Sequence, residues 1–411
     1  MSTLKVNKLR DTSGSTDAIT LDPNGGAVLA GVTTVSTVKV GSGVTISSDG
    51  DVFTTGITTS STVIVGSGVT ISESGIEASG IGITCANING SQIGGRRNII
   101  INGAMNVAQR GTSSTSTGGV NVIDRIDYRV YGADETPTQA QVDVASGTSP
   151  YTEGFRKSFK FTNGNETGGA DAADYARMIY SVEAQDLAKS GWNYTSSSSF
   201  VSLSFWIKSS VAQNFYFIFN TADGGQTRSY VMETGSLTAD TWTKITKTFP
   251  GDSQVAFDND TGVGCYLYIY GYLGTNYADN SVSVNAWKNV ANPQTPVNTT
   301  TWWTTNDATL EITGLQLEVG PQATAFEHRS FNEELALCKR YFHNFSGYTY
   351  AVDHGVNSFS HFPFHTEMRA NPTVSGTFLN AAGNYSSAMR GMYYHNGNSS
   401  NAQNVTFDAE I

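Results

Sequence analysis

A 25-residue repeat near the start of the chain is the feature that most restricts its fold. The segment from Gly31 to Ser47, GVTTVSTVKVGSGVTIS, returns as GITTSSTVIVGSGVTIS from Gly56 to Ser72. Each copy alternates polar and branched apolar residues on both sides of a Gly-Ser-Gly turn. This pattern predicts two short β-strands joined by residues that tolerate positive φ. A period of this length is typical of arrays that stack one small unit on the next.

Only one face of the repeat needs to be buried, because position 39 is Lys in the first copy while its equivalent, position 64, is Ile. Ser, Thr and Gly supply 45 of the first 97 residues, and Phe53 is the single aromatic residue there, so this segment cannot build an ordinary core. Since a sheet needs a second layer, we expect identical chains to supply it in an intertwined homotrimeric shaft. The alternative is a disordered Ser/Thr/Gly linker. The apolar positions that recur are Val38, Val40, Val44 and Ile46 in the first copy and Val63, Val65, Val69 and Ile71 in the second.

Charge and composition disfavour several classes of protein. The chain has 24 Lys and Arg against 35 Asp and Glu, and a net charge of −11 disfavours binding to phosphate backbones, so we expect no nucleic-acid partner. No uncharged apolar run approaches the roughly 20 residues that cross a bilayer, and the first residues lack a secretion signal. We therefore expect no transmembrane segment and synthesis in a cytoplasm. Cys85, Cys265 and Cys338 lie far apart without a CxxC spacing, which predicts neither a disulfide framework nor a zinc or redox centre.

The chain after residue 97 predicts a large antiparallel β domain. The run VSLSFWIK at 201–208 alternates, with Trp206 and Lys208 opposite its apolar face. Only 14% of all residues are charged, and the composition is typical of an all-β protein. Turn clusters separate the runs at the spacing of a jelly roll or β-sandwich. The predicted strands cover 155–162, 201–208, 215–219, 242–249, 265–272 and 310–317.

One short helix is expected after this domain, since Ser330 and Glu333 have the spacing of a capping box. The apolar residues of the segment fall on one helical stripe: Phe331, Leu335, Cys338 and Phe342. The aromatic, His-bearing residues that follow are too few for a large core, so we expect a small β-rich knob that needs partner chains. The predicted parts are an N-terminal segment (1–30), the repetitive β shaft (31–97), the jelly roll (98–329), the helix (330–343) and the C-terminal knob (344–411).

The large domain resembles a module of known proteins. Residues 98–111, NIIINGAMNVAQRG, followed by DRIDY at 124–128, resemble the opening of the carbohydrate-binding-module-like domain found in many phage tail fibres. In that domain an Asn-Gly and a Gln-Arg-Gly precede an Asp-Arg-Trp, and this sequence departs by having Ile126 at the Trp position. Further stretches are similar to the same module: 203–210, 242–249, 310–320 and 326–342.

The N-terminal part is similar to tail fibres of cyanobacterial phages, on STLKVNKLR at 2–10, AITLD at 18–22 and the repeat. Together the resemblances cover about residues 1–345. They imply a homotrimeric virion tail fibre protein, made in the cytoplasm of a bacterial host. Its N-terminus would dock on a phage tail protein such as an adaptor, nozzle or baseplate protein. Its C-terminal parts would meet a glycan or an outer-membrane receptor of the host, and no particular sugar is implied because fold and ligand are separable.

The run CYLYIYGY at 265–272 is the best candidate for a ligand-binding surface. Its alternation predicts four tyrosines on one strand face, and Trp206 likewise lies opposite the apolar side of its own strand. Flat aromatic faces beside polar groups in a preformed groove suit sugars. Alternatively, these rings form the layer between sheets or a subunit contact, since Tyr is buried readily when its hydroxyl has a partner. The candidate residues are Trp206, Tyr266, Tyr268, Tyr270 and Tyr272.

Trp302 and Trp303 are two further candidates. They lie in a Thr- and Asn-rich stretch, TTTWWTTN, that predicts a loop. Exposed tryptophans on loops suit recognition. The alternative is that they fill the edge of the sandwich.

No metal or cofactor is expected. His361 and His365 are weak candidates for ligands, because threefold symmetry would triple each imidazole, but Pro363 prevents a regular helix from aligning the pair. The sequence DNDTG at 258–262 is similar to the start of a calcium loop, yet Ile269 stands where the last carboxylate would fall. We therefore expect a turn there, and the sequence does not support a calcium site.

We predict a receptor-binding tail fibre protein that holds a host-surface glycan or another receptor without covalent chemistry, with several chains supplying avidity. No nucleophile elbow, zincin helix or phosphate loop occurs in the sequence, so no enzyme is expected. One alternative is a tailspike-type polysaccharide depolymerase, whose paired carboxylates a sequence cannot locate. The other is a purely structural fibre or adaptor without a receptor site.

Replacing both Val40 and Val65 with Asp tests the shaft. Each substitution would bury unpaired charges around the threefold axis, so the trimer should be lost. Light scattering of the purified variant measures the mass in solution, and trimers that survive unchanged would contradict the shaft.

Overall fold

The computed structural model describes residues 96–224, 227–352, 359–379, 384–395 and 400–411, and six short strands that precede them in sequence. The chain forms two compact units, Met1–Thr84 and Cys85–Ile411. In the first unit the described strands form two three-stranded antiparallel sheets. One has β1 (Lys8–Leu9), β2 (Ile19–Leu21) and β3 (Ala27–Leu29), and the other has β4 (Thr62–Val65), β5 (Val69–Ser72) and β6 (Gly75–Ala78).

The second copy of the repeat forms the predicted pair of strands. β4 and β5 are antiparallel on either side of residues 66–68, and their register places Val63 opposite Ile71 and Val65 opposite Val69. The sequence did not indicate that β6 would extend this sheet by pairing with β5. The first copy lies outside the described residues, and the trimeric shaft stays a prediction.

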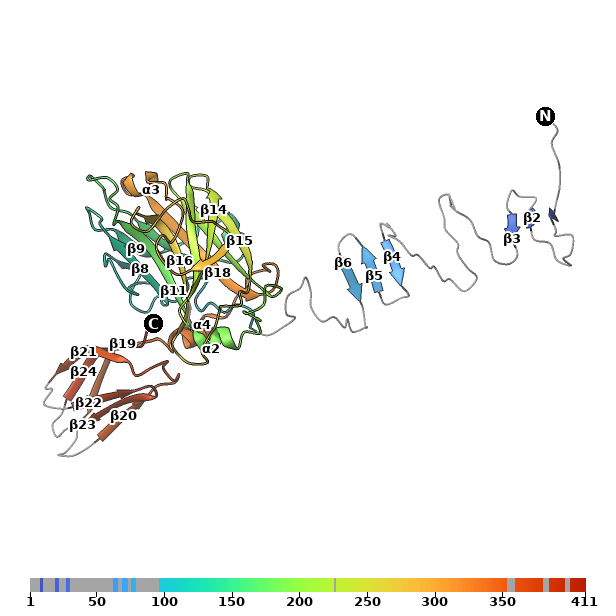
Figure 1. Ribbon diagram of the computed structural model, residues 1–411. Coiled ribbons are helices and arrows are strands. Elements are labelled where there is room, and N and C mark those ends of the chain that lie inside the picture. Colours follow the sequence, from blue (N-terminus) through green and yellow to red (C-terminus); the bar gives the residue numbers. More distant parts are fainter. Residues whose placement is uncertain are drawn as a thin grey trace. The chain divides into compact units, whose positions relative to one another are not determined.

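The second unit contains a sandwich of two six-stranded antiparallel sheets (Figure 1), which confirms the all-β class. The first sheet has the order β15-β12-β18-β10-β9-β7 and the second has the order β17-β14-β13-β16-β11-β8. The strands of the first are β7 (Ser113–Ser114), β9 (Thr138–Asp143), β10 (Lys157–Thr162), β12 (Phe200–Ser209), β15 (Thr243–Pro250) and β18 (Thr309–Val319). Those of the second are β8 (Ile126–Tyr131), β11 (Tyr175–Glu183), β13 (Asn214–Thr221), β14 (Arg228–Ser236), β16 (Val263–Leu273) and β17 (Ala286–Asn289).

The inner faces of the two sheets share one large core that is rich in aromatic rings. Phe205 of β12 meets Phe217 of β13 edge to face, with ring centroids 5.2 Å apart. The predicted alternation of β12 is confirmed, because its inward side chains all belong to this core while Trp206 and Lys208 point to the other side. The inward residues of β12 are Val201, Leu203, Phe205 and Ile207.

Four short helices accompany the described strands: α1 (Ser149–Thr152), α2 (Ala184–Ala188), α3 (Thr301–Thr304) and α4 (Phe331–Cys338). The capping box of α4 is confirmed, since Ser330 Oγ accepts from the Glu333 backbone while the Glu333 carboxylate accepts from Ser330 N. The helix is shorter than predicted and ends at Cys338, and Phe331 is exposed instead of lying on the buried stripe. Within the described part of the chain, no helix has the length and apolar character to cross a membrane.

The last residues form two three-stranded antiparallel sheets, and Val405 and Phe407 of one strand form a small core with Met368. β24 pairs with β19, so the chain returns to the start of this part, and Ala409 N donates to Tyr341 O over 2.8 Å. The strands, in sheet order, are β19 (Phe342–Val352), β24 (Ser400–Asp408) and β21 (Thr373–Leu379), then β20 (Phe359–Pro363), β23 (Gly391–His395) and β22 (Asn384–Ala388).

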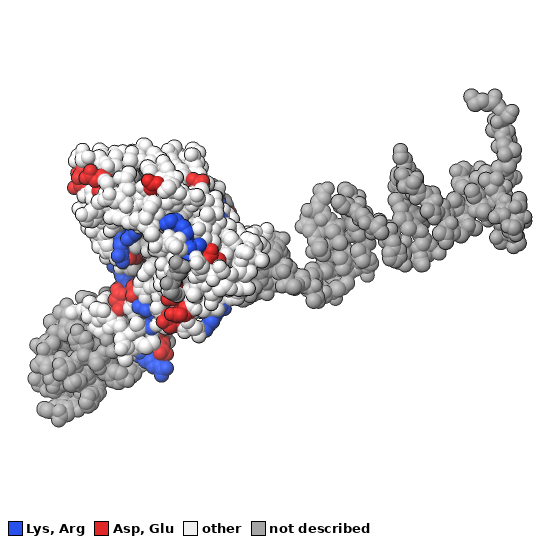
Figure 2. Space-filling model, viewed as in Figure 1, with Lys and Arg blue, Asp and Glu red and all other residues white. Residues whose placement is uncertain are grey.

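Charged side chains are sparse on the face of the second unit that Figure 2 shows. Separate acidic groups lie on its upper part, and acidic and basic groups lie near one another on its lower part, so no broad patch of one sign forms there. Recognition on this face therefore cannot rest on a broad field of one charge, and it needs local contacts.

His343 makes the stability of the last part depend on pH. It is 3% exposed, and its ring stacks on those of Phe364 and Phe345 at 4.7 and 5.7 Å. Burial, with a smaller effect of the Lys339 charge, lowers the pKa of His343 from 6.5 to about 4. The unfolded chain therefore binds the proton more readily, so stability falls as the pH drops from about 6.5 towards about 4.

We expect His343→Phe to flatten this part of the stability profile, because phenylalanine keeps the stacking and has no proton to bind. Melting temperatures between pH 7 and pH 4.5 measure it. His328→Phe is the matched control, since His328 is exposed. A wild-type profile that the His343 variant leaves unchanged would contradict the assignment.

Candidate functional site

The outer face of the second sheet carries a row of tyrosines along β16. Tyr266 and Tyr268 are half-buried, with ring centroids 5.6 Å apart, and Tyr270 follows at 6.0 Å from Tyr268. The register places Tyr268 between Ile179 of β11 and Ile218 of β13. The predicted alternation thus holds from Tyr266 to Tyr270, and the three rings share one face of a rigid sheet.

Tyr272 does not lie on that face, and this part of the prediction was wrong. The consecutive residues Ala176 and Arg177 of β11 pair with Tyr272 and Tyr270, so Gly271 is an extra residue in β16. Such a β-bulge reverses the direction of every later side chain. Tyr272 points into the core, where it is 3% exposed and stacks on Trp303 with centroids 5.2 Å apart.

Tyr270 shares the outer face but is fully buried. Tyr277 and Val282, from the segment after β16, pack with it. Its hydroxyl donates to Gln294 Oε1 over 2.7 Å, and burial raises its pKa. Tyr270 therefore holds Gln294 in place and offers no ring face to a ligand.

A pocket of about 320 Å³ opens beside Tyr268 on the outer face. Its floor consists of strand residues and its wall is the segment 290–294, which follows β17. Lys288 fixes that wall, because its Nζ donates to Ala291 O and Pro293 O, both over 2.9 Å, and burial lowers its pKa. The polar lining residues are Arg177, Asn220, Ser229, Tyr268, Asn292 and Gln294.

A row of aromatic side chains, Tyr268, Tyr175 and Tyr131, continues from this pocket towards β8. The Arg177 guanidinium lies 4.9 Å from the ring centre of Tyr175 and 5.2 Å from that of Tyr268. Tyr175 stacks on Tyr131 at 6.0 Å, and Tyr131 is 59% exposed. The sequence prediction missed these residues of β8 and β11. The alternation in YARMIYSVE, with Tyr175 and Arg177 opposite Ala176 and Met178, was the signal that could have found them.

Trp302 and Trp303 do not lie in an exposed loop, and that expectation was wrong. Both are 0% exposed in α3, where they fill the end of the core between the sheets. Trp302 Nε1 donates to Thr309 O over 3.1 Å, and a Cβ at Gly271 would lie 2.9 Å from the Trp302 ring. Both rings therefore fill the edge of the sandwich, which was the alternative prediction.

Trp206 points away from the main core as predicted, but on the outer side of the first sheet. Phe155 and Ala104 pack with it in a separate small cluster, and it is nearly buried. Its Nε1 donates to Glu153 Oε2 over 3.1 Å, and Lys244 Nζ lies 5.7 Å from its ring centre. Trp206 thus belongs to a surface distinct from the tyrosine row.

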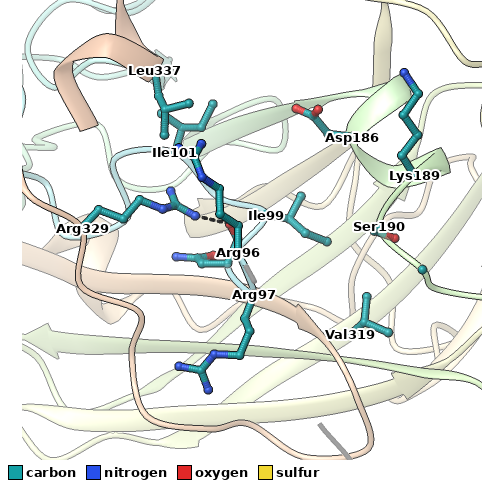
Figure 3. A pocket seen from close by; sticks show the side chains of 12 residues that line it. Arg96, Arg97, Ile99, Ile101, Asp186, Lys189, Ser190, Val319, Arg329 and Leu337 are labelled. Carbon is teal, nitrogen blue, oxygen red and sulfur yellow. Dashed lines mark hydrogen bonds between the residues drawn. The ribbon is translucent and has the colours of Figure 1, made fainter. Parts of the chain in front are cut away.

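A second pocket, of about 410 Å³, is lined by four basic residues, Arg96, Arg97, Lys189 and Arg329 (Figure 3). Arg329 is committed to the fold, because its guanidinium donates to the carbonyls of Asn98 and Ile100 and pairs with Glu334 at 3.4 Å. None of the described residues around this pocket is aromatic. This pocket lies between the start of the domain and the segment before α4. Its described lining offers no flat ring on which a sugar could stack.

The structure offers no metal centre among the residues it describes. No group of three or more His, Cys, Asp or Glu side chains in that part of the chain could hold an ion. His361 lies in β20, and the side chain of His365, beyond the strand, is exposed. The segment 258–262 forms the predicted turn, in which Asp260 Oδ1 accepts from Gly262 N over 2.8 Å.

Comparison with known proteins gives matches in structure alone. No family model matches the sequence, and the search of curated proteins found no match. The chain is similar to the enzymatically active domain of tailspike protein 4 of bacteriophage CBA120, with 8% identity and a TM-score of 0.28 over 54% of this chain and 21% of that one. It is also similar to the N-terminal cellulose-binding domain of Cellulomonas fimi β-1,4-glucanase C, with 9% identity and a TM-score of 0.25 over 52% and 97%.

A third similar structure is the family 11 carbohydrate-binding module of Clostridium thermocellum Lic26A-Cel5E. It has 14% identity and a TM-score of 0.23, over 49% of this chain and 91% of that one. The match spans about a fifth of the tailspike structure. At these identities and TM-scores, the function of this chain has to be argued from its own site.

The environments of the tyrosines predict different effects on stability. Tyr272→Ala should lower the free energy of unfolding by about 3 kcal/mol or more, because it leaves a cavity beside Trp303. Tyr268→Ala should lower it by about 1 kcal/mol, since that ring is half-exposed already. Urea denaturation followed by tryptophan fluorescence measures both, and equal losses would contradict the bulge at Gly271.

Proposed function

We propose that this chain is a phage tail fibre protein that binds a glycan of the host surface on the outer face of its second sheet. One observation carries the proposal: the half-buried Tyr268 borders a preformed pocket lined by Asn220, Gln294 and Arg177. A sugar ring stacks on a flat aromatic face, while its hydroxyls exchange hydrogen bonds with amide and guanidinium groups. The pocket supplies both kinds of contact.

The binding that we propose is non-covalent and uses a site that exists before the ligand arrives. Tyr268 and Asn220 stand on strands in the middle of a six-stranded sheet, and Tyr270 and Lys288 hold the wall. Little conformational entropy is lost on binding when the contacting groups are already ordered. No cofactor and no bond cleavage are part of this mechanism.

The tail fibre role is supported by the repeat and by the resemblance of its N-terminal sequence to phage tail fibres. We propose a homotrimer in the virion, docked through its N-terminus on an adaptor, nozzle or baseplate protein. One shallow pocket binds weakly, but three copies per fibre and several fibres per particle convert weak contacts into firm attachment. The receptor in this proposal is a glycan, free or attached to an outer-membrane component.

Tyr268→Ala and Asn220→Ala test the site. Losing the stacking ring should remove about 1.4 kcal/mol of binding free energy, which weakens the binding of each site about tenfold. Binding of the labelled trimer to susceptible cells should weaken more, because several sites bind at once. The matched control is Tyr151→Ala, since Tyr151 lies by the cluster of Trp206 on the other sheet. Flow cytometry of cells at increasing protein concentration measures the change.

Other outcomes separate the alternatives. Release of oligosaccharide from surface polysaccharide by the purified protein would indicate a depolymerase. Failure of the folded trimer to bind any susceptible strain would indicate a structural fibre without a receptor site. If both pocket variants bind as well as the wild type, the receptor site does not lie on this face.

A further inference from the structure

We infer that the pocket on the second sheet selects an acidic glycan, one whose sugar carries a carboxylate or sulfate, and that Arg177 is the residue that recognises this charge. The inference rests on the proposed function and adds the chemical class of the ligand. It comes from a charge that the fold leaves unpaired beside the aromatic rings.

Arg177 has no ion-pair partner among the described residues. Arg129 stands directly opposite it across β8 and β11, and like charges in that position repel. Arg129 is neutralised by Asp127, whose Oδ2 accepts from its Nε over 2.9 Å. The other oxygen of Asp127 accepts from Gly119 N over 3.0 Å, so this carboxylate is already committed.

The guanidinium of Arg177 is held at the pocket and not free in solvent. It lies between the rings of Tyr175 and Tyr268, which limits its rotamers, and it lines the pocket. Its Nε is buried without a hydrogen-bond partner. A partly desolvated cation without a counter-ion lowers stability, and an anionic ligand would remove that penalty.

The rest of the pocket suits an acidic sugar. No Asp or Glu is among the described residues that line it, so nothing there repels an anion. Asn220 supplies a neutral amide for hydroxyls, while Gln294 already bonds Tyr270 and Asn292 and forms part of the wall. Lys288 is occupied by two carbonyls, so Arg177 is the cation left to contact the ligand's charge. A planar guanidinium binds a carboxylate or sulfate through two parallel hydrogen bonds.

The net charge of −11 makes this recognition local. The chain as a whole repels anions at long range, so an acidic glycan gains its affinity from the contact with Arg177 and not from steering. A neutral glycan would leave the guanidinium desolvated and unpaired. The site therefore discriminates against neutral glycans as well as favouring acidic ones.

The test uses the full-length protein and surface polysaccharide extracted from a strain that the labelled protein binds. Three forms of the polysaccharide are compared by surface plasmon resonance: native, carboxyl-reduced and desulfated. We expect the wild type to bind one of the two neutralised forms at least tenfold more weakly than the native form. If the carboxyl-reduced form binds more weakly, the recognised group is a carboxylate; if the desulfated form does, it is a sulfate.

Two variants assign the effect to Arg177. Arg177→Gln keeps a polar amide but removes the charge. Its affinity for the native polysaccharide should therefore fall to that of the wild type for the neutralised polysaccharide that binds more weakly. Arg177→Lys keeps the charge but loses the planar fork, and we expect intermediate binding. Arg156→Gln is the matched control, because the Arg156 guanidinium also lies over a tyrosine ring, 3.9 Å from the centre of Tyr151, and does not line the pocket; it should bind like the wild type. Unfolding midpoints of all variants confirm folding, and Arg177→Gln should not lower the midpoint, because it removes a desolvated cation and breaks no ion pair.

The outcomes for the inference and for the proposed function are distinct. Equal binding of all three polysaccharides by the wild type, with loss on Tyr268→Ala, would overturn the acidic ligand and leave glycan binding on this face in place. Equal binding by Arg177→Gln and wild type would likewise overturn the role of Arg177. No binding of any extracted polysaccharide by the wild type would overturn both.

Discussion

Burial of the inner faces of the two sheets against each other is the constraint on which the rest of the second unit depends. Residues such as Phe205 and Phe217 meet in an aromatic core that no solvent reaches. Since side chains alternate along a strand, burying one face of β16 forces Tyr266, Tyr268 and Tyr270 onto the other face. The same rule places Tyr175 and Arg177 on the outer side of β11. The candidate site is therefore a product of the core, and its rigidity comes from the core.

A single extra residue divides the tyrosines of β16 between the core and the outer face of the sheet. At Gly271 the bulge turns Tyr272 inward onto Trp303, while the absence of a side chain leaves room for the Trp302 ring. The segment after β16 then covers Tyr270 and leaves Tyr268 at the edge of the pocket. One aromatic run thus serves the core, the support of the pocket wall and the pocket itself.

Buried charges connect the C-terminal residues to the sandwich. Arg125 pairs with Glu410, and its guanidinium lies 3.4 Å from the ring centre of Tyr341. Glu183, also buried, accepts from Arg340 over 2.7 Å and from the Tyr341 hydroxyl over 2.6 Å. Removal of one partner would leave an uncompensated charge in the interior, which is strongly destabilising. In contrast to these paired groups, Arg177 has no counter-ion within the described part of the chain, and the proposed recognition of an acidic ligand rests on this difference.

The sequence by itself determined the all-β class, the strands of the second repeat, the strand runs of the sandwich, the capped helix and the outward direction of Tyr266 and Tyr268. Each of these follows from local period or spacing, which short-range sterics and the need to bury one face dictate. Only the tertiary structure decided that Tyr272, Trp302 and Trp303 are core residues, that Tyr270 is covered, and that Arg177 lines a pocket without an ion-pair partner among the described residues. Bulges, covering segments and charge pairs depend on partners more than a hundred residues away in some cases, as between Arg125 and Glu410, and no local pattern encodes them.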